Sequence, residues 1–451
     1  MKLFNHCHIH CRNKVHRMEG SFPKNATREF WPFQSYNNSS GIMPGLASVN
    51  KKWQDTRRKL QTDILAPQTA ATYIPSLATA AKDISATFPE LCHDMDHFCM
   101  RAVFDMFSAA ILGRSYRTLV ADVTDEVGRD FAVNTQEAFR LCGDLLVDPM
   151  EKVFYNWGVS TQKYKEFVKY MDASYRGAEL LTKQSLEGVT RQQGLRTEQY
   201  DSNDAVNLFD GKLPANDMDM IDGSYIQRLI RRGALTVDEA IIEVPPLVFA
   251  GVDTTASALM WFLVNLARNP DKQALLAEEL DSVLQGRNFT ANANLPYLRA
   301  CSRESHRITP AAAGIGYRIL DTDIELHGYN VPAGTRIHFN LEVLSSDPSL
   351  VVDVDQFQPE RWFPENIAAR KGTPSEVLDH RLIATPFSFG PRMCIGGRLA
   401  EVEIMTAVCR LVQDYEFTLC DNHPPVTRKE RLMLMPAQSP HFTARARSRN
   451  V

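Results

Sequence analysis

Apolar residues recur at helical spacing through the first half of this chain. From about residue 53 to 187 they return every three or four positions, as in the run Met150, Val153, Phe154 and Trp157. Residues at i, i+3, i+4 and i+7 share one face of a helix. The first half is therefore predicted to be mostly helical.

The second half combines helices with a little sheet. Helical spacing returns at residue 224 and stops at Asn269-Pro270, because proline cannot continue a helix. Further helices are predicted over 271–284, about 295–308 and 398–415. Residues 315–340 have β-like runs separated by turn residues, which predict a small sheet. We therefore expect a mainly α fold with minor β structure.

The 451 residues contain no internal repeat, no low-complexity tract and no Gly/Ser linker. Residues 1–451 are therefore predicted to form a single domain. Residues 190–223 are polar and poor in apolar runs, so we predict a mobile surface loop there.

Charge and cysteine content exclude two classes of protein. Fifty Lys and Arg against 54 Asp and Glu give a net charge of -4, so no basic field attracts nucleic acid. Nine cysteines are an odd number at low density, which argues against a secreted disulfide framework and for free thiols in a reducing compartment.

The longest apolar stretch, residues 241–267, carries Glu243, Asp253 and the pair Pro245-Pro246. This favours a buried helix over a bilayer span. The first 20 residues have neither the apolar core of a secretory signal nor the Ser/Arg pattern of an organellar presequence.

A glycine-rich segment near the carboxyl end, residues 387–397, contains one cysteine just before a predicted helix. Free N–H groups and the positive end of the helix dipole favour a thiolate at Cys394. Gly390 and Gly396 let the backbone approach a flat cofactor, and Arg392 can pair with a carboxylate on it. The alternative is a buried structural cysteine.

This segment resembles the heme-binding loop of the cytochrome P450 family. The family pattern F-x-x-G-x-R-x-C-x-G is matched at every specified position, by Phe387, Gly390, Arg392, Cys394 and Gly396. The resemblance implies the cytochrome P450 fold, with a large helical part and a small β-sheet region. It also implies heme b (iron protoporphyrin IX) whose iron takes an axial thiolate from Cys394.

Two further motifs follow the order of that family. Glu304 and Arg307 lie three apart on a predicted helix, and Arg361 follows in the segment PERW. The resemblance implies that these three residues form a buried structural triad behind the cysteine loop. A solvated surface pair is the alternative for Glu304 and Arg307.

The long apolar helix carries Ala250-Gly251-Val252-Asp253-Thr254-Thr255, which matches the family's A-G-x-D/E-T-T signature for oxygen activation. Gly251, Thr254, Thr255 and Ala258 are predicted to form one small, polar face that leaves room for oxygen and substrate. The resemblance implies that Thr254 hydrogen-bonds the oxygen species and that Asp253 relays protons. The alternative is a capped or kinked helix whose Thr bonds its own backbone.

Heme carboxylates need cations and donors. Trp53 and Arg57 match the family's W-x-x-x-R helix, and Arg392 and Arg318 are further candidates. For Arg318 an exposed strand arginine is the alternative.

In the resembled family the W-x-x-x-R helix follows an anchor or presequence, a first helix and the first strands, whereas only 52 residues precede Trp53 here. We therefore expect an N-terminally truncated chain.

Other residues resemble the mitochondrial, ferredoxin-dependent branch. Arg299 and Arg303 stand four apart on one helix face, where that branch has two basic residues for an acidic ferredoxin. A solvated basic face is the alternative.

The resemblance implies a heme-thiolate monooxygenase that hydroxylates a sterol, steroid, secosteroid or other apolar lipid with O2. Electrons come from NADPH through ferredoxin reductase and ferredoxin, at the mitochondrial inner membrane with peripheral contact. The alternatives are a microsomal, reductase-driven monooxygenase of the endoplasmic reticulum and a non-catalytic or truncated heme-binding protein.

Overall fold

The computed structural model of the protein describes residues 31–48, 50–120, 125–192, 223–312, 317–326, 328–338, 343, 345–380, 386–388, 390–421, 423–430 and 433–448. In chain order the α-helices are α2 (Trp31–Ser40), α3 (Asn50–Ile64), α4 (Pro67–Thr72), α5 (Ile74–Leu91), α6 (Met95–Ile111), α7 (Glu126–Val147), α8 (Pro149–Asn156), α9 (Gln162–Gln192), α10 (Tyr225–Arg231), α11 (Val237–Arg268), α12 (Pro270–Leu284), α13 (Pro296–Ile308), α15 (Pro364–Ala369) and α16 (Gly397–Asp414). Two 3₁₀ helices, η3 (Pro359–Trp362) and η4 (Pro374–Asp379), lie between α13 and α16.

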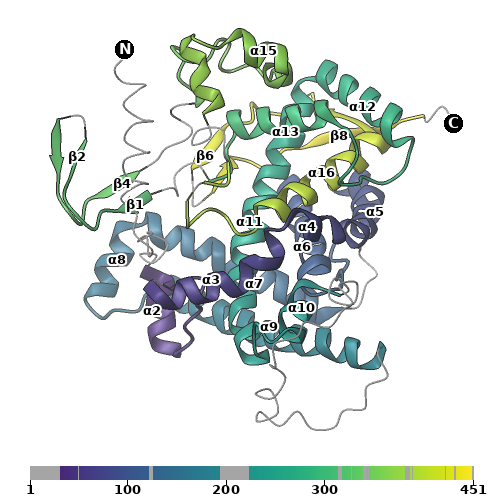
Figure 1. Ribbon diagram of the computed structural model, residues 1–451. Coiled ribbons are helices and arrows are strands. Elements are labelled where there is room, and N and C mark those ends of the chain that lie inside the picture. Colours follow the sequence, from purple (N-terminus) through teal and green to yellow (C-terminus); the bar gives the residue numbers. More distant parts are fainter. Residues whose placement is uncertain are drawn as a thin grey trace, which may run out of the picture.

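Helix α11 runs through the centre of the molecule and packs against α6, α9, α13 and α16 (Figure 1). It is long and apolar enough to cross a membrane by composition, yet 78% of its most apolar window is buried inside the protein. This matches the buried helix predicted from the apolar stretch.

Local chemistry sets the ends of α11. The backbone N–H of Glu239 donates to Thr236 Oγ1 and that of Thr236 donates to the Glu239 carboxylate, which makes a capping box. The helix stops at Arg268 before Pro270. The helical spacing predicted from residue 224 belongs to two helices, because α10 has a capping box of its own and ends at Arg231 before α11 begins at Val237.

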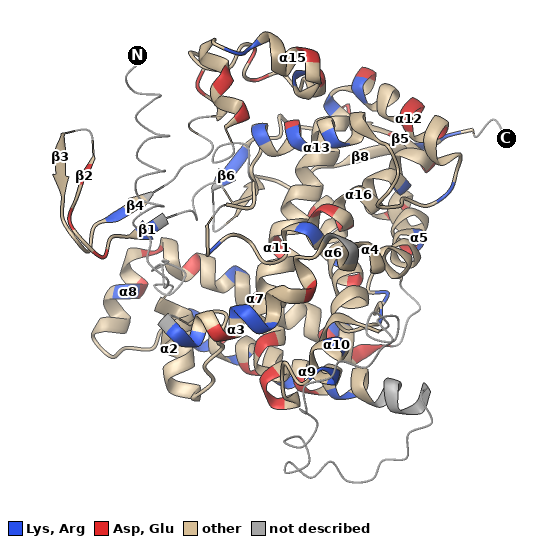
Figure 2. Ribbon diagram, viewed as in Figure 1, with Lys and Arg blue, Asp and Glu red and all other residues tan. Residues whose placement is uncertain are grey.

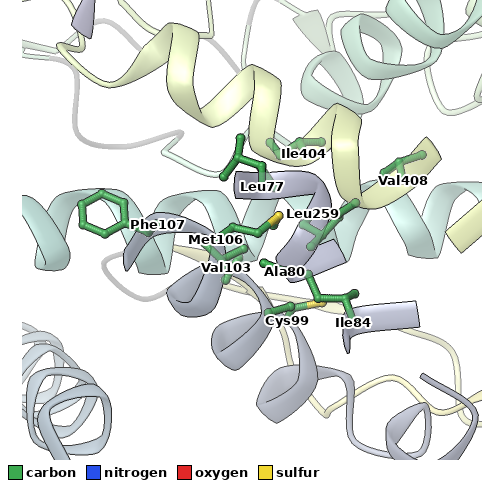
Figure 3. Close-up of a cluster of buried hydrophobic side chains, with 14 of the residues drawn as sticks. Leu77, Ala80, Ile84, Cys99, Val103, Met106, Phe107, Leu259, Ile404 and Val408 are labelled. Carbon is green, nitrogen blue, oxygen red and sulfur yellow. The ribbon is translucent and has the colours of Figure 1, made fainter. Parts of the chain in front are cut away.

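The main hydrophobic core lies where α5, α6, α11 and α16 meet. Figure 3 shows side chains from these helices converging, among them Leu77, Ile84, Val103, Leu259 and Ile404. Each of these five is at most 2% exposed, and burying a side chain of this size contributes about 1.5–3 kcal/mol. This core fixes α16, and hence the cysteine loop that precedes it, against α11.

Short antiparallel pairs make up the β structure. The strands are β1 (Tyr317–Ile319), β2 (Ile324–Leu326), β3 (Tyr329–Val331), β4 (Arg336–His338), β5 (Tyr415–Leu419), β6 (Arg428–Glu430), β7 (Leu434–Pro436) and β8 (Phe442–Ala446). In the described part of the chain they pair as β1 with β4, β2 with β3, β5 with β8 and β6 with β7. The first two pairs lie where the sequence predicts a small sheet; the last two were not predicted.

The predicted fold class, mainly α with minor β, is confirmed. Helix α9 continues to Gln192, so the first residues of the predicted 190–223 loop are helical, and residues 193–222 lie outside the described residues. Figure 2 shows both signs of charge interspersed over the helices, in line with the small net charge of -4.

Candidate active site

The loop before α16 folds back on itself around Cys394. The backbone N–H of Cys394 donates to the carbonyl oxygen of Phe387 at 2.9 Å, and that of Met393 donates to Gly390 O at 3.0 Å. The turn needs left-handed backbone at Ser388 (φ 63°) and Gly390 (φ 75°), which glycine adopts without strain. The sequence places a glycine at one of these two positions.

The Cys394 thiol is exposed to solvent, yet protein surrounds it closely enough that burial raises its pKa. The N–H groups of Gly396 and Gly397 and the charge of Arg57 act against that rise. A side chain that is both accessible and enclosed lines an internal recess. Two N–H donors, a cation and the positive end of α16 would favour its thiolate on a metal.

Two glycines shape the recess. A Cβ on Gly397 would stand 2.9 Å from Phe387 Cγ, so the absence of a side chain there makes room for the Phe387 ring. A Cβ on Gly396 would meet no atom within 4 Å. Open space therefore adjoins the loop beside Cys394.

Helix α11 also borders open space at one place. Ala250 is exposed in the middle of this largely buried helix, and Thr254 one turn later is partly exposed. The Thr254 hydroxyl donates to Ala250 O at 2.7 Å, as the backbone-bonded alternative requires, and its lone pairs remain able to accept.

The predicted open face of α11 is wrong for three of its four residues, which are packed against protein. A Cβ on Gly251 would lie 2.4 Å from Phe107 Cε2, so Gly251 is packed against α6 and leaves no room for oxygen. Thr255 and Ala258 are 3% and 7% exposed. Ala250 and Thr254 form the open face instead.

Asp253 is the acid of this helix segment. Within the residues that the structure describes, its carboxyl has no hydrogen bond or ion pair, and burial raises its pKa to about 8. The carboxyl is therefore protonated at neutral pH and can donate a proton.

Three of the four candidate carboxylate-binding residues are largely buried, and the fourth, Arg392, is partly exposed. Trp53, Arg57 and Arg318 are 3%, 7% and 3% exposed. The Arg392 guanidinium stacks 3.6 Å from the Trp53 ring, and Arg57 Nε donates to Gln61 Oε1 at 3.2 Å. The structure thus joins Trp53 to Arg392 and brings Arg57 near Cys394, whereas Arg318 lies on β1 in a small sheet.

The structure assembles the three residues of the predicted triad. Glu304 is fully buried, and both its oxygens accept from Arg307, at 2.8 and 3.0 Å. Arg361 Nε donates to it at 3.2 Å. Glu304 also accepts from Trp362 Nε1 at 2.8 Å and from the Gln358 backbone N–H at 3.2 Å, two donors that the sequence did not reveal.

This network connects α13 to the segment that leads toward the cysteine loop. Arg307 donates as well to the carbonyl oxygens of Ser345 and Gln356, at 3.0 and 3.2 Å. Removing one partner of a buried ion pair typically costs about 3–5 kcal/mol, because the remaining charge is left uncompensated.

The two arginines of the predicted basic face on α13 have different surroundings. Arg299 is exposed and donates to Ala293 O at 3.1 Å. The guanidinium of Arg303 lies 4.0 Å from the centre of the Trp362 ring and is partly buried. Arg303 is therefore less accessible than Arg299, because its guanidinium covers an indole, and the binding of a partner by these two arginines stays a prediction.

One residue near the site was missed. His306, between Glu304 and Arg307 in the chain, has its ring 6.0 Å from that of Phe387, in an edge-on arrangement. Burial lowers its pKa to about 4, so the imidazole is neutral. The sequence feature that could have pointed to His306 is its position inside the motif formed by Glu304 and Arg307.

Comparisons with known proteins agree with this site. A family model described as "Cytochrome P450" matches residues 3–443. "Probable cytochrome P450 49a1" of Drosophila melanogaster is 30% identical over 385 residues, which are 83% of this chain and 62% of that protein. This chain thus spans under two thirds of that relative's length.

Two mitochondrial enzymes are also similar. "1,25-dihydroxyvitamin D(3) 24-hydroxylase, mitochondrial" of Mus musculus is 26% identical, over 91% of this chain and 73% of its own length. "Sterol 26-hydroxylase, mitochondrial" of Oryctolagus cuniculus is 26% identical, over 94% and 75%. The chain belongs to the cytochrome P450 family, whose members are monooxygenases that bind heme b through a cysteine thiolate.

Proposed function

We propose that this chain is a heme-thiolate monooxygenase that hydroxylates an apolar, sterol-like lipid with O2 and electrons relayed from NADPH by a ferredoxin. The observation that carries the proposal is the environment of Cys394. Its accessible sulfur faces open space, two N–H groups and Arg57 stabilise its negative charge, and α16 begins just behind it.

The residues around this space fit heme b. Cys394 supplies one sulfur donor, and the open side of Gly396 and the exposed Ala250 leave room for a flat group. Arg57 provides a buried positive charge for its carboxylates, and Arg392, partly exposed and stacked on Trp53, provides a second one. Heme b would supply the iron centre at which O2 is bound and activated.

Helix α11 carries the two residues that can deliver protons to the site. Asp253 holds a proton at its carboxyl up to about pH 8, and the Thr254 hydroxyl next to it faces the open space. With its own hydrogen bonded to Ala250 O, the Thr254 oxygen accepts a hydrogen bond from a water or a bound group. Together the two residues can pass a proton from the helix toward the open face.

An apolar substrate is supported by the residues next to that face. Phe249, one position before Ala250, packs edge-on against Phe33 of α2 at 5.3 Å and stacks on Phe139 of α7 at 6.2 Å. Phe249 is 6% exposed, so these rings form a buried apolar cluster next to Ala250 in the helix, and mostly apolar surroundings are typical of sites that bind apolar molecules. The names of the two mitochondrial relatives, a sterol hydroxylase and a secosteroid hydroxylase, point to the same class of substrate.

Ferredoxin as donor is supported by exposed cations beside the cysteine loop. Burial raises the pKa of Glu401 on α16, and the charges of Arg398 and Arg299 act against that rise, so both lie near this acid. Arg299 and Arg398 are exposed. The mitochondrial relatives favour a mitochondrial location, and the microsomal alternative differs in its electron donor.

Peripheral membrane contact is supported by one surface. We call the exposed apolar side chains around α8 the α8 patch, which comprises Val147, Met150, Tyr155, Trp157 and Val159. Their exposed fractions run from 39% to 73%. Five large apolar side chains within one short segment are unusual for a surface in water, and they suit a lipid interface.

Replacing the ligand tests the central proposal. In Cys394→Ala, the reduced, CO-treated spectrum should lose the Soret band of thiolate ligation that the unchanged protein shows. Cys420→Ala, at a partly buried cysteine after β5, is the control and should keep that band. A thiolate band in Cys394→Ala would refute the proposal, and an unchanged protein that takes up no heme would favour the truncated, non-catalytic alternative.

Asp253→Asn tests proton delivery. The raised pKa means that the wild-type acid is protonated below about pH 8 and ionised above it, so wild-type turnover should fall as pH rises through 8. The variant should lose about a hundredfold in product formed per unit time and lack this alkaline decline. Asp238→Asn, exposed at the start of the same helix, should behave as wild type. A full alkaline decline in Asp253→Asn would contradict the role.

Arg299→Glu tests the electron donor. The KM for ferredoxin should rise about tenfold at low ionic strength, and the difference should shrink as salt screens the charges. Lys82→Glu makes the same charge change at an exposed position on α5 and should have little effect. Turnover supported by a microsomal diflavin reductase and not by ferredoxin would favour the alternative.

The α8 patch is tested with vesicles of phosphatidylcholine and cardiolipin. Met150→Ser combined with Trp157→Ser should lower the bound fraction at least about tenfold, since about 1.4 kcal/mol of lost burial has that effect. Leu275→Ser with Val352→Ser removes two exposed apolar side chains elsewhere and is the matched control. Equal binding by both double variants would exclude the α8 patch as the contact.

A further inference from the structure

We propose that Glu243 is a positioning residue for the heme cradle. Its carboxylate anchors the segment 41–48 on α11, and this segment in turn sets the place of α3 with Trp53 and Arg57. The proposal rests on the heme-binding role given above to α3.

The anchor itself is buried. Glu243 is 5% exposed on the second turn of α11, and its two oxygens accept the backbone N–H groups of Gly45 and Leu46, at 2.5 and 3.2 Å. Hydrogen bonds to a carboxylate are stronger than neutral ones, and their loss in a buried place leaves two amides without partners. These two amides of the segment therefore depend on this one side chain for their hydrogen bonds.

The same segment lies directly against α3. A Cβ on Gly45 would stand 1.9 Å from Thr56 Oγ1, so only a glycine allows this approach. Lys52 Nζ, also from α3, donates to Met43 O at 2.8 Å. Two contacts thus make the segment and α3 one unit, and Thr56 is the immediate neighbour of Arg57.

A second contact between α11 and α3 is weaker. Lys59 Nζ and Glu239 Oε1 are 2.7 Å apart, but their side chains are 39% and 44% exposed, and such pairs contribute about 0–1 kcal/mol. Prolines at 245 and 246 lack N–H groups, so the first turns of α11 have fewer hydrogen bonds of their own. The later part of α3 is held by α10, where Tyr225 Oη donates to Leu60 O at 2.7 Å and Arg232 pairs with Asp63. The contact at Glu243 is then the buried polar link from α11 to the segment that packs on the part of α3 next to Arg57.

The test compares Glu243→Ala with wild type in the heme-loaded protein. Amide hydrogen exchange at Gly45 and Leu46 should become at least about tenfold faster, and transfer of heme to excess apomyoglobin should accelerate by a similar factor. Glu243→Gln keeps one acceptor oxygen, so its amide exchange and its heme transfer should both be slower than those of Glu243→Ala. If Glu243→Ala does not fold, Glu243→Gln is compared with wild type in its place.

Two control variants separate positioning from general stability. Lys59→Met removes the exposed pair and should leave heme release nearly unchanged. Leu284→Ala opens a cavity in α12, far along the chain from α3, and should lower the unfolding temperature without accelerating release. Equal acceleration in Leu284→Ala would show that Glu243 acts only through stability.

Amide exchange and heme release test two different parts of the proposal. Unchanged exchange at Gly45 and Leu46 would overturn the anchor. Faster exchange with unchanged heme release would overturn the connection to the cradle. If the wild-type protein bound heme without a thiolate band, the proposed function would fail, while the exchange result would still decide whether Glu243 anchors the segment.

Discussion

A single carboxylate, that of Glu304, organises the half of the molecule that contains the cysteine loop. Fully buried, it would be costly as a lone charge, and it is tolerated because two arginines, an indole N–H and a backbone N–H surround it. The donors come from two segments, Arg307 from α13 and the other three from residues 358–362 at η3. Satisfying the charge therefore requires these segments to adopt one relative arrangement, which suits a part of the fold that must hold a ligand still.

Helix α11 has to combine a packed side with an open side. It must be apolar enough to lie in the core and yet expose one short stretch to a cofactor and its substrate. Three neighbouring positions divide these tasks. Gly251 allows α6 to approach closely, Ala250 leaves its side of the helix open, and Asp253 keeps a proton in a poorly solvated place. A uniform row of small residues would not have separated the packed side from the open one.

Features with short, local spacing could be predicted from the sequence. The cysteine loop, the Glu304 and Arg307 pair, and the long buried helix all fall in this group, and so does the fold class. The errors concern contacts between distant segments. That Gly251 faces Phe107, or that Arg303 covers Trp362, depends on how helices pack, which spacing along one helix does not specify. Strands β5 to β8 are three to five residues long and too short for a periodic signal.

The stacking of Arg303 on Trp362 connects the surface with the interior. The indole that this guanidinium covers is the same one that donates to Glu304. A lysine has a compact ammonium and no flat face, so it could carry the charge without shielding the ring. Exchanging these two cations at position 303 would thus keep the surface charge while leaving Arg370, at 5.1 Å, as the remaining guanidinium on the ring, and sequence comparisons that treat the pair as equivalent would overlook the difference.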